Sequence, residues 1–150
     1  MMRLVLVHHA DAVGPEVDPQ RPLSMIGRFD VERLAAATAT KGVKPAVIWH
    51  SGKLRSRQTA EAFWKACNPF AELKATRGLQ PSDGPWLFRD VLAEETRDLL
   101  VVGHMPSLPR IFALLSAGSE DANLGFPLHG VIALEREPDD RLWKEAWRLP

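Results

Sequence analysis

The stretch LVLVHHADA, residues 4–12, decides the fold class. Its first four residues are apolar without polar alternation, which is typical of a strand buried on both faces in a parallel sheet covered by helices. The run then ends abruptly in His8, His9 and Asp11. Polar groups at the carboxyl end of such a strand lie where open α/β sheets bind their ligands. The stretch therefore predicts a buried first strand that ends at a functional site.

Short apolar runs alternate with longer amphipathic segments along the chain, which predicts an α/β fold. Further strands are expected at 45–51, 71–75 and 98–104, and helices at 24–42, 53–67, 84–95 and 106–118. A final antiparallel hairpin is expected from 130–137 and 141–149, around the turn PDD. The predicted architecture is a three-layer sandwich, a central mostly parallel sheet flanked by helices, in a single domain over residues 1–150. The first helix should bury Ile26, Phe29, Leu34 and Ala37.

The amino-acid composition argues against some classes of binding partner and indicates a cellular compartment. The 150 residues hold 19 Lys+Arg and 19 Asp+Glu, so the net charge is zero and no global field favours nucleic acid or an anionic membrane. No apolar run approaches the length of a membrane span or of a signal peptide's core. The single cysteine, Cys67, excludes an internal disulfide and fits a reducing compartment, so a cytoplasmic location is expected.

Two other predicted strands also end in polar groups. Ser51 follows the second and can cap the next helix, which carries Arg55, and His104 follows the strand at 98–104. A helix N-terminus with an arginine suits an oxyanion, phosphate above all. Taken alone, such a serine and arginine are more often a helix cap and a solvated side chain. The coincidence of three strand ends favours one shared phosphate site.

Five pieces in order, VHHADA, RPLSMIG, SGKLRSRQTAEAF, LQPSDG and LLVVGHMPSL, resemble the histidine phosphatase superfamily, also called the phosphoglycerate mutase-like fold. The similarity covers nearly the whole chain and is greatest to the short SixA-type phosphohistidine phosphatases. By this resemblance His9 is the nucleophile, Arg55 clamps the phosphoryl oxygens and His104 stabilises the transferring group. The resemblance also brings Arg21 to the pocket, while Ser51 matches a motif position.

The signature departs from the family at two of three positions, because Arg-His-Gly is replaced by His8-His9-Ala10. His8 stands where an arginine clamps phosphate, and we expect it to substitute in part if it is protonated. Losing one preorganised oxyanion donor costs on the order of 10²–10³ in rate. Ala10 is expected to cost about 1 kcal/mol if the backbone needs close approach or positive φ there.

The function that the resemblance implies is a metal-independent phosphatase that works through a covalent phosphohistidine and needs no cofactor. The expected substrate is a protein-borne phosphohistidine, and a small phosphomonoester is the alternative. A catalytically weakened phosphate- or phosphoprotein-binding module of the same fold also stays open. In that scheme His9, Arg55 and His104 are catalytic, and His8, Arg21 and Ser51 bind phosphate.

Two questions remain open from the sequence. A metal-hydrolase reading would use His8, His9, Asp11 and His104 as ligands, although adjacent histidines on a strand point to opposite faces. No general acid stands out, and the candidates are Asp83, Asp11 and Glu94 or Glu95. His129 precedes the final hairpin and can face the site, although a structural role is the more common one for such a residue.

Overall fold

The structure is a computed structural model, and it describes residues 1–150. Six strands and four helices follow one another along the chain. In order they are β1 (Met2–His8), α1 (Met25–Thr40), β2 (Val47–His50), α2 (Leu54–Cys67), β3 (Glu72–Ala75), α3 (Pro85–Ala93), β4 (Leu99–Gly103), α4 (Ser107–Ala117), β5 (Val131–Arg136) and β6 (Lys144–Leu149).

The strands form a single mixed sheet in the order β3-β2-β4-β1-β5-β6. The first four strands of the chain pair in parallel, β1 and β2 each with β4, and β3 with β2. β5 runs antiparallel to β1, and β6 antiparallel to β5, so the predicted final hairpin is confirmed. The sheet is therefore mostly parallel, as the buried apolar runs predict.

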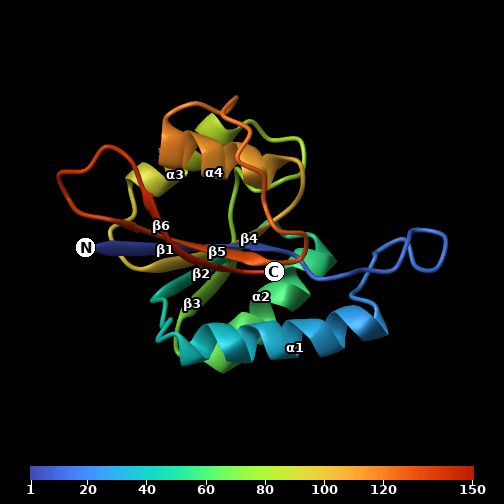
Figure 1. The fold of residues 1–150 in the computed structure, drawn as a ribbon. Helices are drawn as coiled ribbons and strands as arrows, with labels where there is room; N and C mark the ends of the chain where they lie inside the picture. Colours follow the sequence, from blue (N-terminus) through green and yellow to red (C-terminus); the bar gives the residue numbers. More distant parts are fainter.

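Helices cover both faces of the sheet, α3 and α4 on one side and α1 and α2 on the other (Figure 1). Alternate side chains of β1 enter two different cores, because successive residues of a strand point to opposite faces. Leu4 and Leu6 pack in the cluster that holds Phe88 of α3, whereas Val5 and Val7 pack in the cluster that holds Phe63 of α2. The three-layer sandwich expected from the sequence is confirmed.

The buried face of α1 matches the predicted one only in part, because Leu34 and Ala37 are half-buried and Leu34 packs against the core. Ile26 and Phe29 are 68% and 63% exposed, and the buried positions are instead Gly27, Val31, Ala35 and Thr38. A side chain at Gly27 would collide with the backbone of Asp11, so the helix begins in close contact with the chain that follows β1. Small residues at the contact give little apolar signal, which is why hydrophobic periodicity wrongly includes Ile26 and Phe29.

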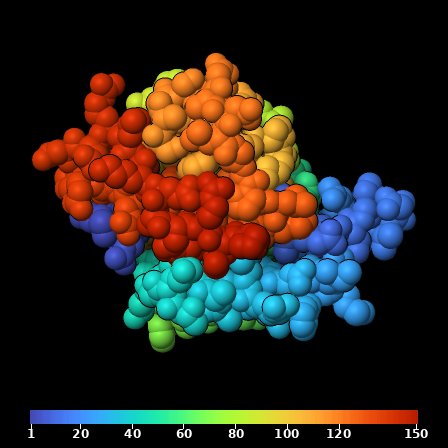
Figure 2. Space-filling view, in the orientation of Figure 1, coloured from blue at the N-terminus to red at the C-terminus, as the bar shows by residue number.

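No helix in the structure combines the length and the apolar composition that crossing a membrane would require. The segment between β1 and α1 projects from one end of the molecule and is held by the bridge between Ala12 and Leu23 (Figures 1 and 2).

Candidate functional site

The carboxyl ends of three neighbouring strands meet at one edge of the sheet. In the registers, His8 lies opposite Gly103 of β4, and His50 of β2 lies opposite Val102. The residues that follow each strand therefore emerge side by side. The ring centroids of His9 and His104 are 4.9 Å apart, so the strand ends do converge as predicted.

His9 is fixed in one tautomer by its own backbone neighbour. Its Nδ1 lies 2.8 Å from the carbonyl oxygen of Ala10, and because a carbonyl only accepts, Nδ1 must carry the hydrogen. In the neutral ring, Nε2 then keeps its lone pair. Burial, followed by the charge of Arg55, lowers the pKa of His9 to about 4 despite the opposing effect of the hydrogen bond to Ala10. The ring is therefore neutral and nucleophilic near pH 7.

His104 is almost fully buried and is held by a chain of two hydroxyls. Its Nε2 lies 2.6 Å from Ser51 Oγ, which lies 2.7 Å from Ser56 Oγ, and Ser56 Oγ donates to the carbonyl of Lys53. The other ring nitrogen, Nδ1, is buried without a hydrogen-bond partner. Burial and neighbouring charges, His9 first, lower the pKa of His104 to about 3. Because Ser56 gives its hydrogen to Lys53 and Ser51 gives its hydrogen to Ser56, the ring hydrogen of neutral His104 lies on Nε2, and the buried Nδ1 keeps a lone pair without a donor.

Ser51 does not begin α2. Lys53 occupies the N-cap position and makes no side-chain cap, and Ser51 Oγ accepts a longer hydrogen bond of 3.3 Å from the Lys53 N–H. The Ser51 hydroxyl is thus surrounded by protein groups and lies against the ring of His104.

Two guanidinium groups face the site without a carboxylate partner. Neither Arg55 nor Arg21 takes part in a salt bridge, and Nε of Arg55 is buried with no hydrogen-bond partner. Burial, followed by the charge of Arg21, lowers the pKa of Arg55, and both charges also lower the pKa of His9. Arg21 reaches inward from a left-handed backbone (φ 52°) while its Nε donates to the carbonyl of Val13. Uncompensated charges of this kind suit an oxyanion.

Two side chains of α2 tie the segments of the site together. Thr59 Oγ1 accepts the N–H of Ala10 at 3.0 Å and donates to the carbonyl of Arg55. Gln58 Oε1 accepts the N–H of Leu23 at 2.8 Å, which anchors the segment that carries Arg21. One turn of α2 thereby fixes the spacing between His9 and the guanidinium groups.

His8 is neutral in this structure, so by itself it does not supply the positive charge of the family's arginine. Burial and the neighbouring His9 and His129 lower its pKa to about 3. Its Nδ1 accepts the backbone N–H of His129 at 2.8 Å, so the ring hydrogen lies on Nε2. His8 thus offers one neutral N–H donor where the family has a charged fork.

The predicted strain at Ala10 is also absent. The non-glycine residues with positive φ are Arg21, Asn123 and His129, and Ala10 is not among them. Its side chain is 5% exposed and belongs to the core cluster on the α1 and α2 face. The Cβ that replaces the family's glycine is therefore buried in apolar packing, where it is favourable.

His129 is the site residue that sequence reasoning undervalued. Its Nδ1 lies 2.7 Å from the carbonyl oxygen of His9, and its ring stacks on that of His8 with centroids 4.9 Å apart. The residue lies in the turn before β5, far from the other site residues in sequence. No local pattern marks it, because the antiparallel pairing of β5 with β1 alone brings it to the pocket.

The histidines close enough to share a metal ion are His8, His9 and His129, each with a ring nitrogen within 4.8 Å of the others. This group differs from the predicted ligand set, since it includes His129 and neither Asp11 nor His104. His8 Nδ1 is already occupied by the His129 N–H, and its other nitrogen carries the hydrogen. The geometry thus leaves two free ring nitrogens, those of His9 and His129.

The predicted general acids lie in different places. Asp83 accepts the N–H of Gln80 as part of a turn, and Glu95 is held by Arg97, which lowers its pKa to about 2. Glu94 and Glu95 precede β4 and therefore lie at the opposite end of the sheet from the site. Of the four candidates, Asp11 is the one beside the histidines, 4.0 Å from His129 Nε2.

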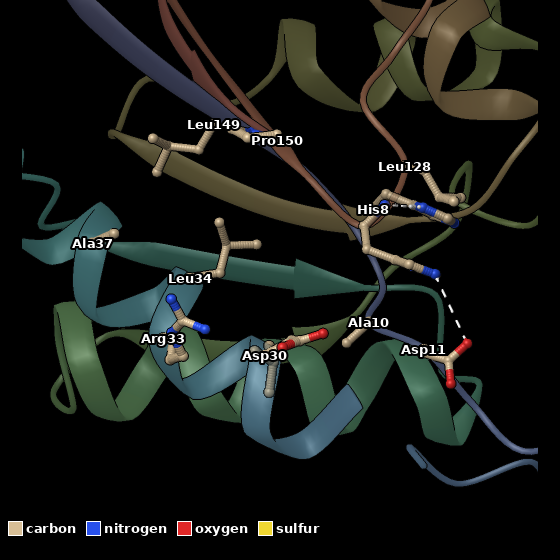
Figure 3. A pocket seen from close by; sticks show the side chains of 12 residues that line it. His8, Ala10, Asp11, Asp30, Arg33, Leu34, Ala37, Leu128, Leu149 and Pro150 are labelled. Carbon is tan, nitrogen blue, oxygen red and sulfur yellow. Dashed lines mark hydrogen bonds and ion pairs between the residues drawn. The ribbon is translucent and has the colours of Figure 1, made fainter. Parts of the chain in front are cut away.

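A hollow of about 450 Å³ adjoins the histidines (Figure 3). It lies between α1 and the C-terminal end of the chain, with Asp30, Arg33 and Leu34 on the helix side and Leu149 and Pro150 opposite. His9 does not line this hollow, but His8, Asp11 and His129 do, and the ring centroids of His8 and His129 lie 4.5 Å and 6.1 Å from that of His9. A ligand held at His9 can therefore extend into this hollow.

No protein-family model matches the sequence, and no curated protein matches it. Several solved structures do match the structure of this chain. The provisionally named phosphohistidine phosphatase SixA from Agrobacterium tumefaciens is 24% identical with a TM-score of 0.81, over 99% of this chain and 97% of that one. The protein histidine phosphatase SixA complexed with tungstate is 20% identical with a TM-score of 0.83, over 99% and 96%.

A third structure, the provisionally named SixA from Nakamurella multipartitia, is 27% identical with a TM-score of 0.61, over 89% of this chain and 83% of that one. The chain therefore has the fold of the histidine phosphatase superfamily, as its motifs predict, and its architecture matches the SixA structures.

Proposed function

We propose that this protein is a phosphatase of the histidine phosphatase type, in which Nε2 of His9 attacks phosphorus and forms a covalent phosphohistidine that water then hydrolyses. The observation that carries the proposal is the His9 ring. Its Nδ1–H is held by the carbonyl of Ala10, its pKa is about 4, and two unpaired guanidinium groups lie nearby. A neutral, oriented imidazole beside uncompensated positive charge is what phosphoryl transfer requires.

The remaining pocket groups bind the oxygens of the transferring phosphoryl group. Arg55 and Arg21 supply the charge, and the unpartnered Nδ1 of His104 holds a further oxygen once the negative phosphoryl group draws a proton onto it. His8 contributes its Nε2–H as a neutral donor. Ser51 positions His104 rather than contacting phosphate. Because the guanidinium groups neutralise developing charge, we propose a reaction that needs no metal. A similar structure binds tungstate, an analogue of phosphate, which supports an oxyanion pocket here.

The proposed substrate is a phosphohistidine carried by another protein. Three large apolar side chains, Met25, Ile26 and Phe29, are exposed in the first turns of α1, and Leu128 is exposed beside His129. The α1 N-cap, Ser24, donates to the Asp11 carboxylate at 2.6 Å, so these apolar groups lie at the rim of the pocket. Clustered exposed apolar residues are typical of protein-binding surfaces. The half-buried free thiol of Cys67 is consistent with a cytoplasmic location.

The alternative is a phosphoprotein-binding module with weak turnover, because neutral His8 lacks the charge of the family's arginine. The test compares a phosphohistidine-bearing protein with small phosphate esters, on wild type and His9→Asn. Asparagine keeps a side-chain N–H for the carbonyl of Ala10 and removes the nucleophile. We expect faster hydrolysis of the phosphoprotein, and a loss of about 10⁴-fold or more in the variant. Binding without turnover in the wild type would favour the module instead.

A further inference from the structure

His129 is held in a backbone conformation that is uncommon for residues other than glycine. Its backbone φ is 51°, in the left-handed region that costs a non-glycine residue energy. Its N–H donates to His8 Nδ1, and its Nδ1 donates to the carbonyl of His9 at 2.7 Å. Strained residues persist where the surroundings hold them and concentrate at functional sites. Here both holding contacts come from the two residues at the end of β1.

The anchoring of Nδ1 leaves Nε2 as the ring nitrogen of His129 that no hydrogen bond of the protein engages. This atom lies 4.0 Å from Oδ1 of Asp11, marked by the dashed line that ends on Asp11 in Figure 3. A ring nitrogen of His129 lies within 4.8 Å of one on His9. Both side chains are open to solvent, with 33% of His129 and 51% of Asp11 exposed, and both line the hollow beside the nucleophile. His129 can therefore reach a group that leaves the phosphorus.

We propose that His129, held beside Asp11, is the general acid that protonates the leaving group; this deepens the phosphatase function proposed above and rests on it. As the bond from His9 Nε2 to phosphorus forms, the bond from phosphorus to the leaving oxygen or nitrogen breaks. The leaving atom keeps the electron pair and takes the proton from His129 Nε2. In the second step water attacks phosphorus, His9 leaves with its electron pair, and the water proton returns to His129. Each turnover thus restores both histidines.

The test separates proton donation from structural support. His129→Asn keeps a side-chain N–H for the carbonyl of His9, and asparagine tolerates positive φ, but it has no proton to give. The rate of alcohol release in the first turnover is measured for phenyl phosphate, whose leaving group is strongly basic, and for dinitrophenyl phosphate, whose leaving group is weakly basic. General acid catalysis contributes about 10²–10⁴-fold. We expect a loss of about 10²-fold or more with phenyl phosphate, and nearly wild-type rates with dinitrophenyl phosphate.

An equal loss with both esters, or no loss with either, would overturn the proposal. Asp11→Asn serves as a second variant, since it keeps an acceptor for the Ser24 hydroxyl and removes the charge beside His129. This variant should show the same selective loss of rate with phenyl phosphate, at smaller magnitude. An equal effect on both esters would again contradict the role of His129 as the acid. The wild type is also assayed on the phosphohistidine-bearing protein, and the proposed phosphatase function fails if neither this protein nor either ester is dephosphorylated. If only the protein reacts, both variants are compared on it, and unchanged rates overturn the acid. A wild type that reacts with the esters while both variants lose rate uniformly refutes the acid alone.

Discussion

Three histidines of the pocket take their chemical character from one contact each. The carbonyl of Ala10 frees Nε2 of His9 for attack, the N–H of His129 turns His8 into a neutral donor, and Ser51 holds Nε2 of His104. The motif comparison predicts the positions of these residues in the site. It cannot predict their tautomers, because those depend on backbone groups that only the folded chain brings into range.

Replacing His8 by arginine tests the cost of restoring the family signature. An arginine adds charge for the oxyanion but cannot accept the His129 N–H, which then lies without its partner. We expect His8→Arg to bind tungstate more tightly and to unfold more easily, by about 1–3 kcal/mol. Urea unfolding and tungstate titration measure the two effects. His8→Asn, which keeps an acceptor, should retain the stability, and an arginine variant as stable as the wild type would contradict this account.

The depressed pKa of His9 has a direct spectroscopic test. Burial disfavours the protonated ring, so the folded protein protonates His9 only near pH 4, below the ordinary value of 6.5. The ring resonances in an NMR titration should therefore stay in the neutral form as the pH falls from 7 to about 5. The same histidine in urea-unfolded protein is the control and should titrate at the ordinary value. A folded midpoint near 6.5 would show that the ring is solvated.

At the level of elements, α2 organises the site. From a single turn it supplies Arg55, the Gln58 anchor for the segment of Arg21, and the Thr59 anchor for Ala10. The element boundaries follow closely from sequence, since apolar runs mark the strands and Ser24 and Gly118 mark two helix ends, although the expected cap at Ser51 is not formed. The buried face of α1 does not, because Gly27 and Ala35 pack through their small size rather than their hydrophobicity.

Thr59→Val tests this role of α2. Valine keeps the shape of threonine but cannot accept the N–H of Ala10, which is left buried and unsatisfied. We expect a stability loss of about 1–3 kcal/mol and a drop in kcat that exceeds any change in KM, because the nucleophile is no longer fixed. Thr59→Ser is the matched control and should keep most of both properties. Wild-type activity in the valine variant would show that the anchor has no effect on the site.

At the scale of the whole molecule, the site exists because the topology gathers the ends of β1, β2 and β4 at one edge and then returns β5 beside β1. Strand ends are visible in the sequence, so the convergence of His9, Arg55 and His104 is predictable. The arrival of His129 and the loss of charge at His8 are not, because both depend on pairing between distant segments and on burial.

Burial of neutral histidines also sets how stability responds to pH. The pKa of His8 and of His104 is about 3 in the folded protein, against 6.5 when unfolded, so the unfolded chain binds more protons between these values. Stability is therefore fully present above pH 6.5 and declines as the pH falls toward 3. Each histidine contributes a slope of about 1 kcal/mol per pH unit in that window. The contribution of His8 is measured from the free energy of unfolding in urea, at pH 7 and at pH 5, for the wild type and for His8→Asn. Between pH 7 and pH 5 the wild type should lose more stability than the variant. Equal losses would contradict the buried neutral state of His8.

The central claim is that Nε2 of His9 becomes covalently phosphorylated. The most direct measurement is rapid acid-free quenching of the protein with a phosphodonor, followed by mass spectrometry of the peptide that contains residues 4–12. We expect one phosphate on His9, stable to base and lost in acid, and no label in His9→Asn. Turnover with no phosphohistidine on this peptide, or equal labelling of the variant, would contradict the mechanism.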